Sequence, residues 1–287
     1  FGFEISYSSS MRESPERSRL FQTIFPGERD LGAKLEITPQ DGPLSFLNFK
    51  GGIFAGNGTA SETDNAKDLI GRLGFQLPFY EENLAIDGGV SGYFGQVRLD
   101  NTKLVNNVAV LAKTYTIDSP TGFSVDSTTR FIDRTYVGAD LQIYYDLPVL
   151  GGFTLRGEYI QGKNPGTSSS NAPYRVSQGD IYLRNFYGYY LMYVQNIGLS
   201  NQFIFKYDVF DPNKDLSADQ IGIAANRSSA SDVKYTTIGL GWVHHWDSNV
   251  KFVLYYDLVK NEEVANLSSL KSDLKDNVIT FRMQYKF

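Results

Sequence analysis

The stretch Asn277-Val-Ile-Thr-Phe-Arg-Met-Gln-Tyr-Lys-Phe287 alternates apolar and polar side chains strictly over its last nine residues. Its apolar side chains occupy every second position from 279 to 287, and polar ones lie between them. Because successive side chains of a strand point to opposite faces, this period predicts a strand with apolar surroundings on one side only. A soluble sheet buries such a face under a second layer, whereas a transmembrane barrel turns it towards lipid.

The composition favours β structure and excludes several classes of protein. The 287 residues include 19 Tyr, 20 Phe and 27 Gly but only 2 Trp, and aromatic residues favour strands. No run of about 18 apolar residues is present, so we expect no transmembrane helix. The absence of Cys excludes disulfides and thiolate metal sites. A net charge of −5 argues against nucleic acid as a partner.

The alternation seen in the last stretch recurs along the whole chain. It predicts eleven strands joined by connections that are alternately short and long, which is typical of the short turns and long external loops of transmembrane barrels. The expected strands cover residues 31–37, 47–55, 69–77, 84–94, 134–145, 153–159, 186–195, 203–209, 236–242, 250–258 and 277–287. The expected long loops cover residues 7–30, 56–66, 98–129, 161–183, 211–231 and 261–276. In the first of these, Ser14 and Pro15 predict the cap and first turn of a short helix.

Charged side chains gather on the faces opposite the apolar rows. A packed soluble core could not hold so many charges, but a water-filled lumen can. A large soluble β-sandwich would also alternate, although it explains less well the long strands and the unequal connections. The fifteen charges on these faces are Lys34, Glu36, Lys50, Arg72, Asp87, Arg134, Asp140, Arg156, Glu158, Lys206, Asp208, Lys251, Asp257, Arg282 and Lys286.

Eleven strands would begin at one rim of a barrel and end at the other. Single-chain bacterial barrels have an even number of antiparallel strands. The count therefore predicts that at least one strand, together with an export signal, precedes residue 1 in the natural protein. We expect residues 1–287 to form a single barrel domain that is incomplete at its N-terminus, with residues 7–30 as an inward-folding or external loop.

Several segments, spread over nearly the whole chain, resemble the phosphate-selective porins (porins O and P) of bacterial outer membranes. The resemblance implies a transmembrane antiparallel β-barrel of about 16 strands in a Gram-negative outer membrane, where porins are often trimers. It also implies that the terminal aromatic residue, Phe287, is the signal read by the barrel assembly machinery. The segments are Phe1-Gly-Phe-Glu4, Glu16-Arg17-Ser18, Gly27-Glu-Arg-Asp-Leu-Gly32, Gly51-Gly-Ile-Phe-Ala-Gly-Asn-Gly58, Lys67-Asp-Leu69, Tyr207-Asp-Val-Phe-Asp-Pro-Asn213, Asp247-Ser-Asn249, Asn261-Glu-Glu263 and Tyr285-Lys-Phe287.

In that family, arginines at a constriction and a lysine-lined exit favour anions. Guanidinium groups suit this task because their planar fork meets phosphate oxygens while staying charged. The faces assigned to the lumen carry nine cations and six anions, however, so mixed ion pairs that stiffen the barrel are an alternative role for the same residues. The anion-binding or constriction candidates are Arg17, Arg19, Arg29, Lys50, Arg72, Arg134, Arg156, Lys206 and Arg282.

The remaining motifs do not indicate chemistry. Asp211-Pro-Asn-Lys-Asp215 resembles a calcium loop but lacks its glycine and its final Glu, so we interpret it as an Asx-turn. His244 and His245 are adjacent and would point to opposite faces of a strand, which suits an interfacial position better than a metal site. No spacing of Ser, His and Asp indicates a hydrolase. We expect no catalytic residue, no metal and no cofactor.

Together these patterns predict a passive outer-membrane porin for small hydrophilic solutes, with a bias towards anions such as phosphate. The alternative is a structural barrel subunit of a larger envelope complex with no transport role. The expected partners are membrane lipid and the barrel assembly machinery, and the sequence identifies neither the solute nor the organism.

Overall fold

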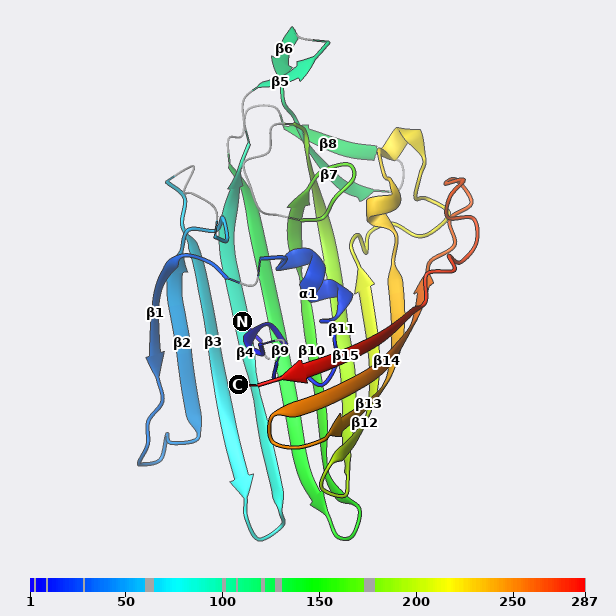
Figure 1. The fold of residues 1–287 in the computed structure, drawn as a ribbon. Helices are drawn as coiled ribbons and strands as arrows, with labels where there is room; N and C mark the ends of the chain where they lie inside the picture. The colour runs from blue at the N-terminus through cyan, green and yellow to red at the C-terminus, as the bar shows by residue number, and fades with distance from the viewer. Residues whose placement is uncertain are drawn as a thin grey trace.

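The computed structural model describes residues 1–2, 4–8, 10–27, 29–59, 65–99, 102–106, 108–119, 122–126, 131–172 and 179–286. Eleven long strands form one antiparallel sheet that bends around the first residues of the chain (Figure 1). In order across the sheet they are β1 (Gly32–Ile37), β2 (Leu47–Phe54), β3 (Asp68–Phe79), β4 (Leu84–Arg98), β9 (Phe131–Leu147), β10 (Gly151–Gly166), β11 (Ile181–Ile197), β12 (Asn201–Asp211), β13 (Tyr235–His245), β14 (Val250–Asn261) and β15 (Val278–Tyr285). The predicted all-β fold with an antiparallel sheet is confirmed.

Consecutive long strands of the chain are also neighbours in the sheet. At one end of the sheet, tight turns join them in pairs. The turn after β9 brings Gly151 opposite Leu147, and the turn after β11 brings Asn201 opposite Ile197. Gly151 and Gly198 have φ values of 98° and 62°, a conformation that glycine adopts without a Cβ clash. Within the described residues β1 and β15 are the two edges of the sheet and do not pair with each other.

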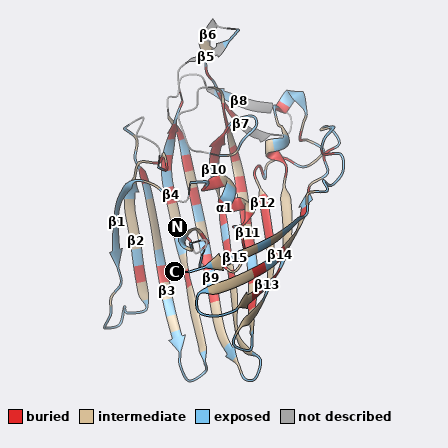
Figure 2. Cartoon of the chain, in the orientation of Figure 1, coloured by how far each residue is buried: buried red, intermediate tan, exposed pale blue. Residues whose placement is uncertain are grey.

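The two faces of the sheet differ as the alternation predicts. On β15, Ile279, Phe281 and Met283 are 74%, 69% and 61% exposed on the outer face. On the central strands, the residues of the inner face are buried under the N-terminal segment, and Figure 2 shows their bands alternating with more exposed positions. Arg134 on β9 and Lys206 on β12 are among these buried inner residues. The polar face is therefore concave and the apolar face is convex.

Aromatic side chains form two rows on the outer face. Near the tight turns, Phe153 lies between Tyr145 and Tyr193, with ring centroids 5.8 and 5.6 Å apart. Nearer the long loops, Tyr159 stacks on Tyr187 at 6.5 Å. Phe153 and Tyr159 are six residues apart on β10, which corresponds to about 20 Å along a strand. This spacing approaches the roughly 25 Å apolar band of outer-membrane barrels with its two aromatic girdles.

Two of the predicted loops differ from the structure. The loop expected at 98–129 contains strands, because its residues pair with each other and, in one short stretch, with the start of β11. These strands are β5 (Thr102–Val105), β6 (Val108–Leu111), β7 (Thr114–Ser119) and β8 (Gly122–Asp126). The loop expected at 161–183 is shorter, since β10 continues to Gly166 and β11 begins at Ile181.

The predicted helix exists but begins later than Ser14. Helix α1 (Arg19–Ile24) has Ser18 at its N-cap, and three one-turn 3-10 segments are η1 (Glu4–Ser6), η2 (Ala224–Asn226) and η3 (Ala230–Asp232). Tertiary burial of Leu20, Phe21 and Ile24 places the helix, because these side chains are 0% exposed. Across the described ranges, no helix has the length and apolar character needed to cross a membrane.

Candidate functional site

The concave face of the sheet is occupied by residues 4–8 and 10–27, which we call the insert. We call the sheet of eleven long strands the wall. Helix α1 of the insert lies against the middle of the wall, and the last two strands of the wall, β14 and β15, pass across the other side of the helix (Figure 1). The aromatic side chains of α1 and the residue after it anchor it. Phe21 meets Tyr190 of β11 at 6.4 Å, and Phe25 meets Tyr136 of β9 at 5.7 Å and Tyr93 of β4 at 6.1 Å. Burial of these rings is the main apolar contribution that fixes the insert.

Buried charges anchor the insert at a second point. Glu4 forms an ion pair with Lys206 of β12 and accepts hydrogen bonds from Ser18, at 3.0 Å from the backbone nitrogen and 2.5 Å from the hydroxyl. The backbone nitrogen of Glu4 donates to the Glu158 carboxylate at 2.5 Å, and the Tyr190 hydroxyl donates to the same oxygen at 3.0 Å. Carboxylates of the insert and of the wall are thus joined in one hydrogen-bonded network, as buried charges require.

Three more predicted cations hold the insert. The Arg17 guanidinium donates to the backbone carbonyls of residues 4, 5 and 7 at 3.1–3.3 Å. Arg156 of β10 binds Glu13 through two hydrogen bonds, at 2.9 and 3.2 Å. Arg282 of β15 donates to the carbonyl of Pro15 at 2.8 Å. These side chains fold the insert and attach it to both sides of the wall.

Other predicted cations are engaged within the wall. Arg72 of β3 binds Asp140 of β9, with the shorter contact at 2.5 Å. Arg134 of β9 forms an ion pair with Asp68 of β3 and is buried. Lys50 of β2 binds Glu36 of β1 at 2.9 Å in a half-exposed pair. Such cross-strand pairs are the alternative that the mixed charges of the sequence left open.

The two remaining candidates, Arg19 and Arg29, lie in different places. Arg29 is exposed in the loop between α1 and β1, next to Asp30. Burial raises the pKa of Asp30 above its ordinary value, although its carboxylate accepts hydrogen bonds from the backbone nitrogens of Gly56 and Leu31. Arg19 lies over the ring of Tyr235 at 4.0 Å, on the concave side of the sheet.

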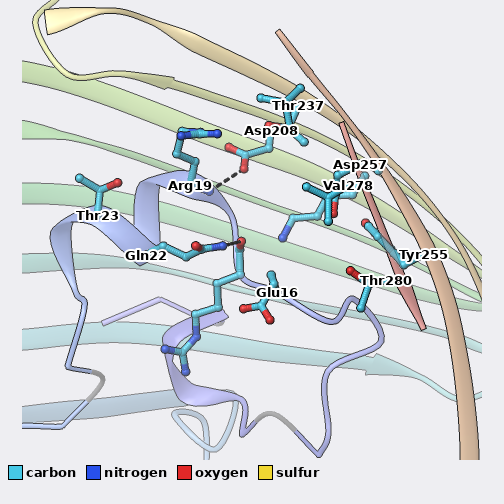
Figure 3. A pocket seen from close by; sticks show the side chains of 14 residues that line it. Glu16, Arg19, Gln22, Thr23, Asp208, Thr237, Tyr255, Asp257, Val278 and Thr280 are labelled. Atoms are coloured by element: carbon cyan, nitrogen blue, oxygen red, sulfur yellow. Dashed lines mark hydrogen bonds between the residues drawn. The ribbon is translucent and has the colours of Figure 1, made fainter. Parts of the chain in front are cut away.

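A chamber of about 430 Å³ opens between the insert and strands β12–β15. Figure 3 shows side chains from both sides pointing into it. Arg19, Gln22 and Glu16 come from the insert, and Asp208, Tyr255 and Thr280 come from β12, β14 and β15. The predicted candidates Arg17, Arg19 and Lys206 also line this chamber, whereas Arg29, Lys50, Arg72, Arg134, Arg156 and Arg282 do not.

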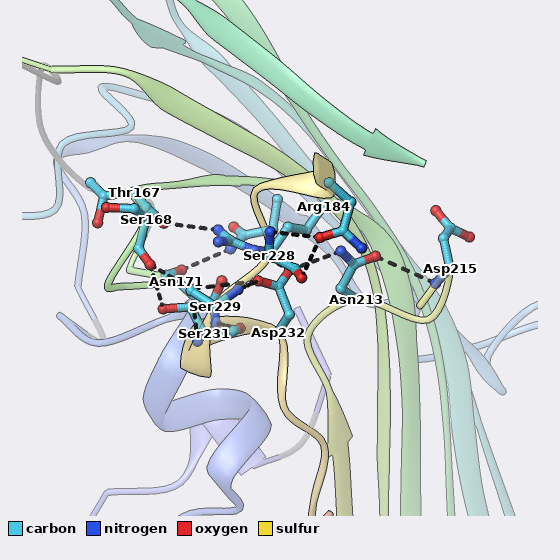
Figure 4. Close-up of polar contacts among 12 residues, drawn as sticks. Thr167, Ser168, Asn171, Arg184, Asn213, Asp215, Ser228, Ser229, Ser231 and Asp232 are labelled. Carbon is cyan, nitrogen blue, oxygen red and sulfur yellow. Dashed lines mark hydrogen bonds and ion pairs between the residues drawn. The ribbon is translucent and has the colours of Figure 1, made fainter. Parts of the chain in front are cut away.

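A separate polar cluster closes the long-loop rim (Figure 4). Arg184 of β11 and Asp232 are both fully buried, and their Nε and Oδ1 atoms are 2.9 Å apart. Asn213 donates to the same Asp232 oxygen at 2.8 Å, and Arg184 donates to the Thr167 carbonyl at 3.0 Å. The other Asp232 oxygen accepts from the Ser229 backbone, forming a capping box on η3. This cluster fixes the loop before β13 against β10 and β11.

The smaller motifs have structural roles. The predicted Asx-turn is confirmed, because the backbone nitrogen of Asn213 donates to the Asp211 carboxylate at 3.1 Å. His244 bonds Asn201 at 2.8 Å and meets the Trp246 ring at 6.2 Å. No group of three His, Cys, Asp or Glu suited to a metal is found in the described part of the chain. The predicted assembly signal, Phe287, lies outside the described residues.

Several residues of the site could not be selected from sequence. Glu4 and Glu13 precede the first predicted strand, and nothing in their spacing indicates contacts with β10 and β12. Tyr255 falls on the same face of its strand as Lys251 and Asp257, but alternation does not single it out from the other residues of that face. No sequence pattern indicates that Arg184 and Asp232 form a pair, because the two residues are 48 positions apart, one in a strand and the other in a loop.

No protein-family model matches the chain, and no curated protein matches it. Among solved structures, the toluene transporter TodX of Pseudomonas putida is similar, with 13% sequence identity. That match covers 89% of this chain and 73% of TodX, with a TM-score of 0.36. The site is therefore interpreted from its own geometry.

Proposed function

We propose that this chain forms the wall of a water-filled channel in a bacterial outer membrane, through which small hydrophilic solutes diffuse. One observation carries the proposal: the convex face is apolar and exposed, while the concave face is charged and borders an open chamber. A barrel in lipid needs the first property and an aqueous lumen needs the second. In this arrangement the insert is the constriction, because it occupies the lumen side of the wall.

The chamber supports a weakly selective pore more than a phosphate-selective one. Within the described residues, seven of the nine predicted cations are engaged by carboxylates or backbone carbonyls. A cation with a fixed anionic or carbonyl partner attracts a passing anion less strongly, because the partner offsets part of the attraction. Arg19 and Arg29 remain as candidates for an anion bias, and the reversal potential in a salt gradient measures that bias directly.

Single-cysteine variants test whether solutes pass through the chamber. The chain has no native Cys, so an introduced thiol is unique. We expect Thr280→Cys, in the chamber, to react with a membrane-impermeant methanethiosulfonate and to lower the current across a planar bilayer. The matched control is Phe281→Cys, whose side chain lies next in the chain but on the lipid side.

Two results would contradict the proposal. Absence of any open-channel current from the intact protein would favour the alternative of a structural subunit. A normal current that is insensitive to modification at position 280 would place the conducting path elsewhere.

A further inference from the structure

Two buried polar atoms in the chamber have no hydrogen-bond partner among the described residues. One Asp208 oxygen accepts from the Arg19 backbone nitrogen at 2.7 Å, but its other oxygen, Oδ1, accepts from none. The Tyr255 hydroxyl is also without a partner in the same part of the chain. Asp208 is 5% exposed and Tyr255 is 2% exposed. Because buried polar groups are almost always satisfied, these two atoms leave hydrogen-bonding capacity beside the chamber that a bound water or a polar ligand would fill.

The Tyr255 hydroxyl has a defined place on the wall. A Cβ added to Gly239 would collide with this hydroxyl, and one added to Gly241 would collide with its ring. The tyrosine therefore lies across two glycines of β13, and its hydroxyl sits over Gly239. Asp257 is the register partner of Gly239 on β14 and also lines the chamber. Asp208, the Tyr255 hydroxyl and Asp257 thus surround one short stretch of β13.

A positive charge lies at the other end of this stretch. The Arg19 guanidinium covers Tyr235, two residues before Thr237 on the same strand. Thr237 is the register partner of Asp208. Two residues of a strand span about 7 Å, so the guanidinium and the Asp208 carboxylate are offset by roughly that distance along the wall.

The other charges of the chamber are already engaged. Lys206 pairs with Glu4, Glu16 lies 3.5 Å from Arg282, and Arg17 donates to three carbonyls. Asp208, Asp257 and Arg19 have no ion pair among the contacts of the described residues. The chamber therefore offers acceptors for an ammonium group, which has three donors, and a separate guanidinium that suits a carboxylate.

We propose that the chamber binds a small zwitterion, an amino acid with its ammonium group at Asp208, Asp257 and Tyr255 and its carboxylate at Arg19. This inference rests on the proposed function, because it names the class of solute for the same lumen. A ligand with one charge would satisfy one end and leave the other unpaired.

Three probes of similar size test the charge requirement. They are 4-aminobutyrate, butyrate and butylammonium, and their binding to the detergent-solubilised full-length protein is measured by isothermal titration calorimetry. We expect 4-aminobutyrate to bind at least about tenfold more tightly than either singly charged probe. Asp208→Asn should remove this advantage over butyrate, and Arg19→Gln should remove the advantage over butylammonium.

The variants are chosen to keep the fold. An Asn at 208 still carries an oxygen that can accept from the Arg19 backbone nitrogen. Tyr255→Phe keeps the ring over the glycines and should weaken the binding of 4-aminobutyrate and of butylammonium, but not that of butyrate. Arg19→Lys should restore part of what Arg19→Gln loses. Asp87→Asn, a lumen-facing change on β4 outside the chamber, should leave binding unchanged.

Each outcome decides between the proposals. Equal binding of butylammonium and the zwitterion would make the chamber a cation site, and equal binding of butyrate would make it an anion site; either result overturns the inference. Normal conductance with no binding of 4-aminobutyrate overturns the inference but leaves the channel intact. Selective binding without any current supports the zwitterion site and overturns the channel.

Discussion

Replacing Phe21 with Ala should release the insert from the wall. The Phe21 side chain is 0% exposed, stacks on Phe25 at 5.9 Å and meets Tyr190 edge-on at 6.4 Å. Truncating a buried Phe to Ala costs about 3–5 kcal/mol, because contacts are lost and a cavity remains. Because 1.4 kcal/mol corresponds to a factor of ten, the fraction of time for which the insert is displaced should rise by a factor of about 10² to 4 × 10³.

Planar-bilayer recording measures this directly, because a displaced insert leaves a wider lumen. We expect rare, large conductance steps in the parent protein and far more frequent ones in Phe21→Ala. Trypsin gives a second reading, since cleavage after the buried Arg17 requires the insert to leave its place.

The control is Phe281→Ala, a truncation of the same residue type that faces outward and is 69% exposed. It should change neither the conductance steps nor the cleavage rate. Equal step frequencies and equal cleavage rates in the two variants would refute the idea that aromatic packing holds the insert.

Three further changes test other parts of the structure. Arg184→Met should destabilise the rim by about 3–5 kcal/mol, because it leaves Asp232 buried without its cation; adding Asp232→Leu should recover part of this loss, as measured by hydrogen exchange. Leu191→Lys, in the middle of the outer face of β11, should lower the free energy of unfolding in liposomes by about 2–4 kcal/mol. Ile197→Lys, near the turn, should lower the same free energy by only about 0–1 kcal/mol. Equal costs for the two variants would contradict the proposed membrane placement. Since the pKa of Asp30 is raised above 3.8 in the folded state, stability from its protonated form should be lost as the pH rises above that value. Thermal unfolding of Asp30→Asn should lack this part of the pH dependence, and an unchanged profile would assign it to other groups.

The wall could be predicted from sequence because one rule holds along most of its strands. The outer face is apolar and the inner face carries the charges, so alternation recurs in most wall strands, including the last one. Alternation did not predict the strands β5–β8, because they lie in the loop region and pair with each other or with the start of β11. The short strand Val108–Leu111 is apolar at every position, so its sequence does not distinguish a buried face from an exposed one.

The contacts of the site were beyond sequence reasoning for a different reason. Alternation places Lys206 and Arg156 on the inner face but does not say which carboxylate each one meets. Their partners are Glu4 and Glu13, at separations of 202 and 143 residues. Many pairings between charges on one concave surface satisfy the same pattern, and only the path of the insert selects among them. The sequence therefore predicted the face of the sheet on which Lys206 and Arg156 lie and left their roles open.

The position of the insert in the chain has a consequence for folding. It precedes every strand on which it docks, so it leaves the ribosome before its binding surface exists. Contacts of such high contact order form late, because a long loop must close before they contribute. We infer that the wall assembles around an unstructured segment and that the insert docks in the final step. Refolding into detergent should then show strand formation by circular dichroism before Arg17 becomes resistant to trypsin; simultaneous changes would contradict this order.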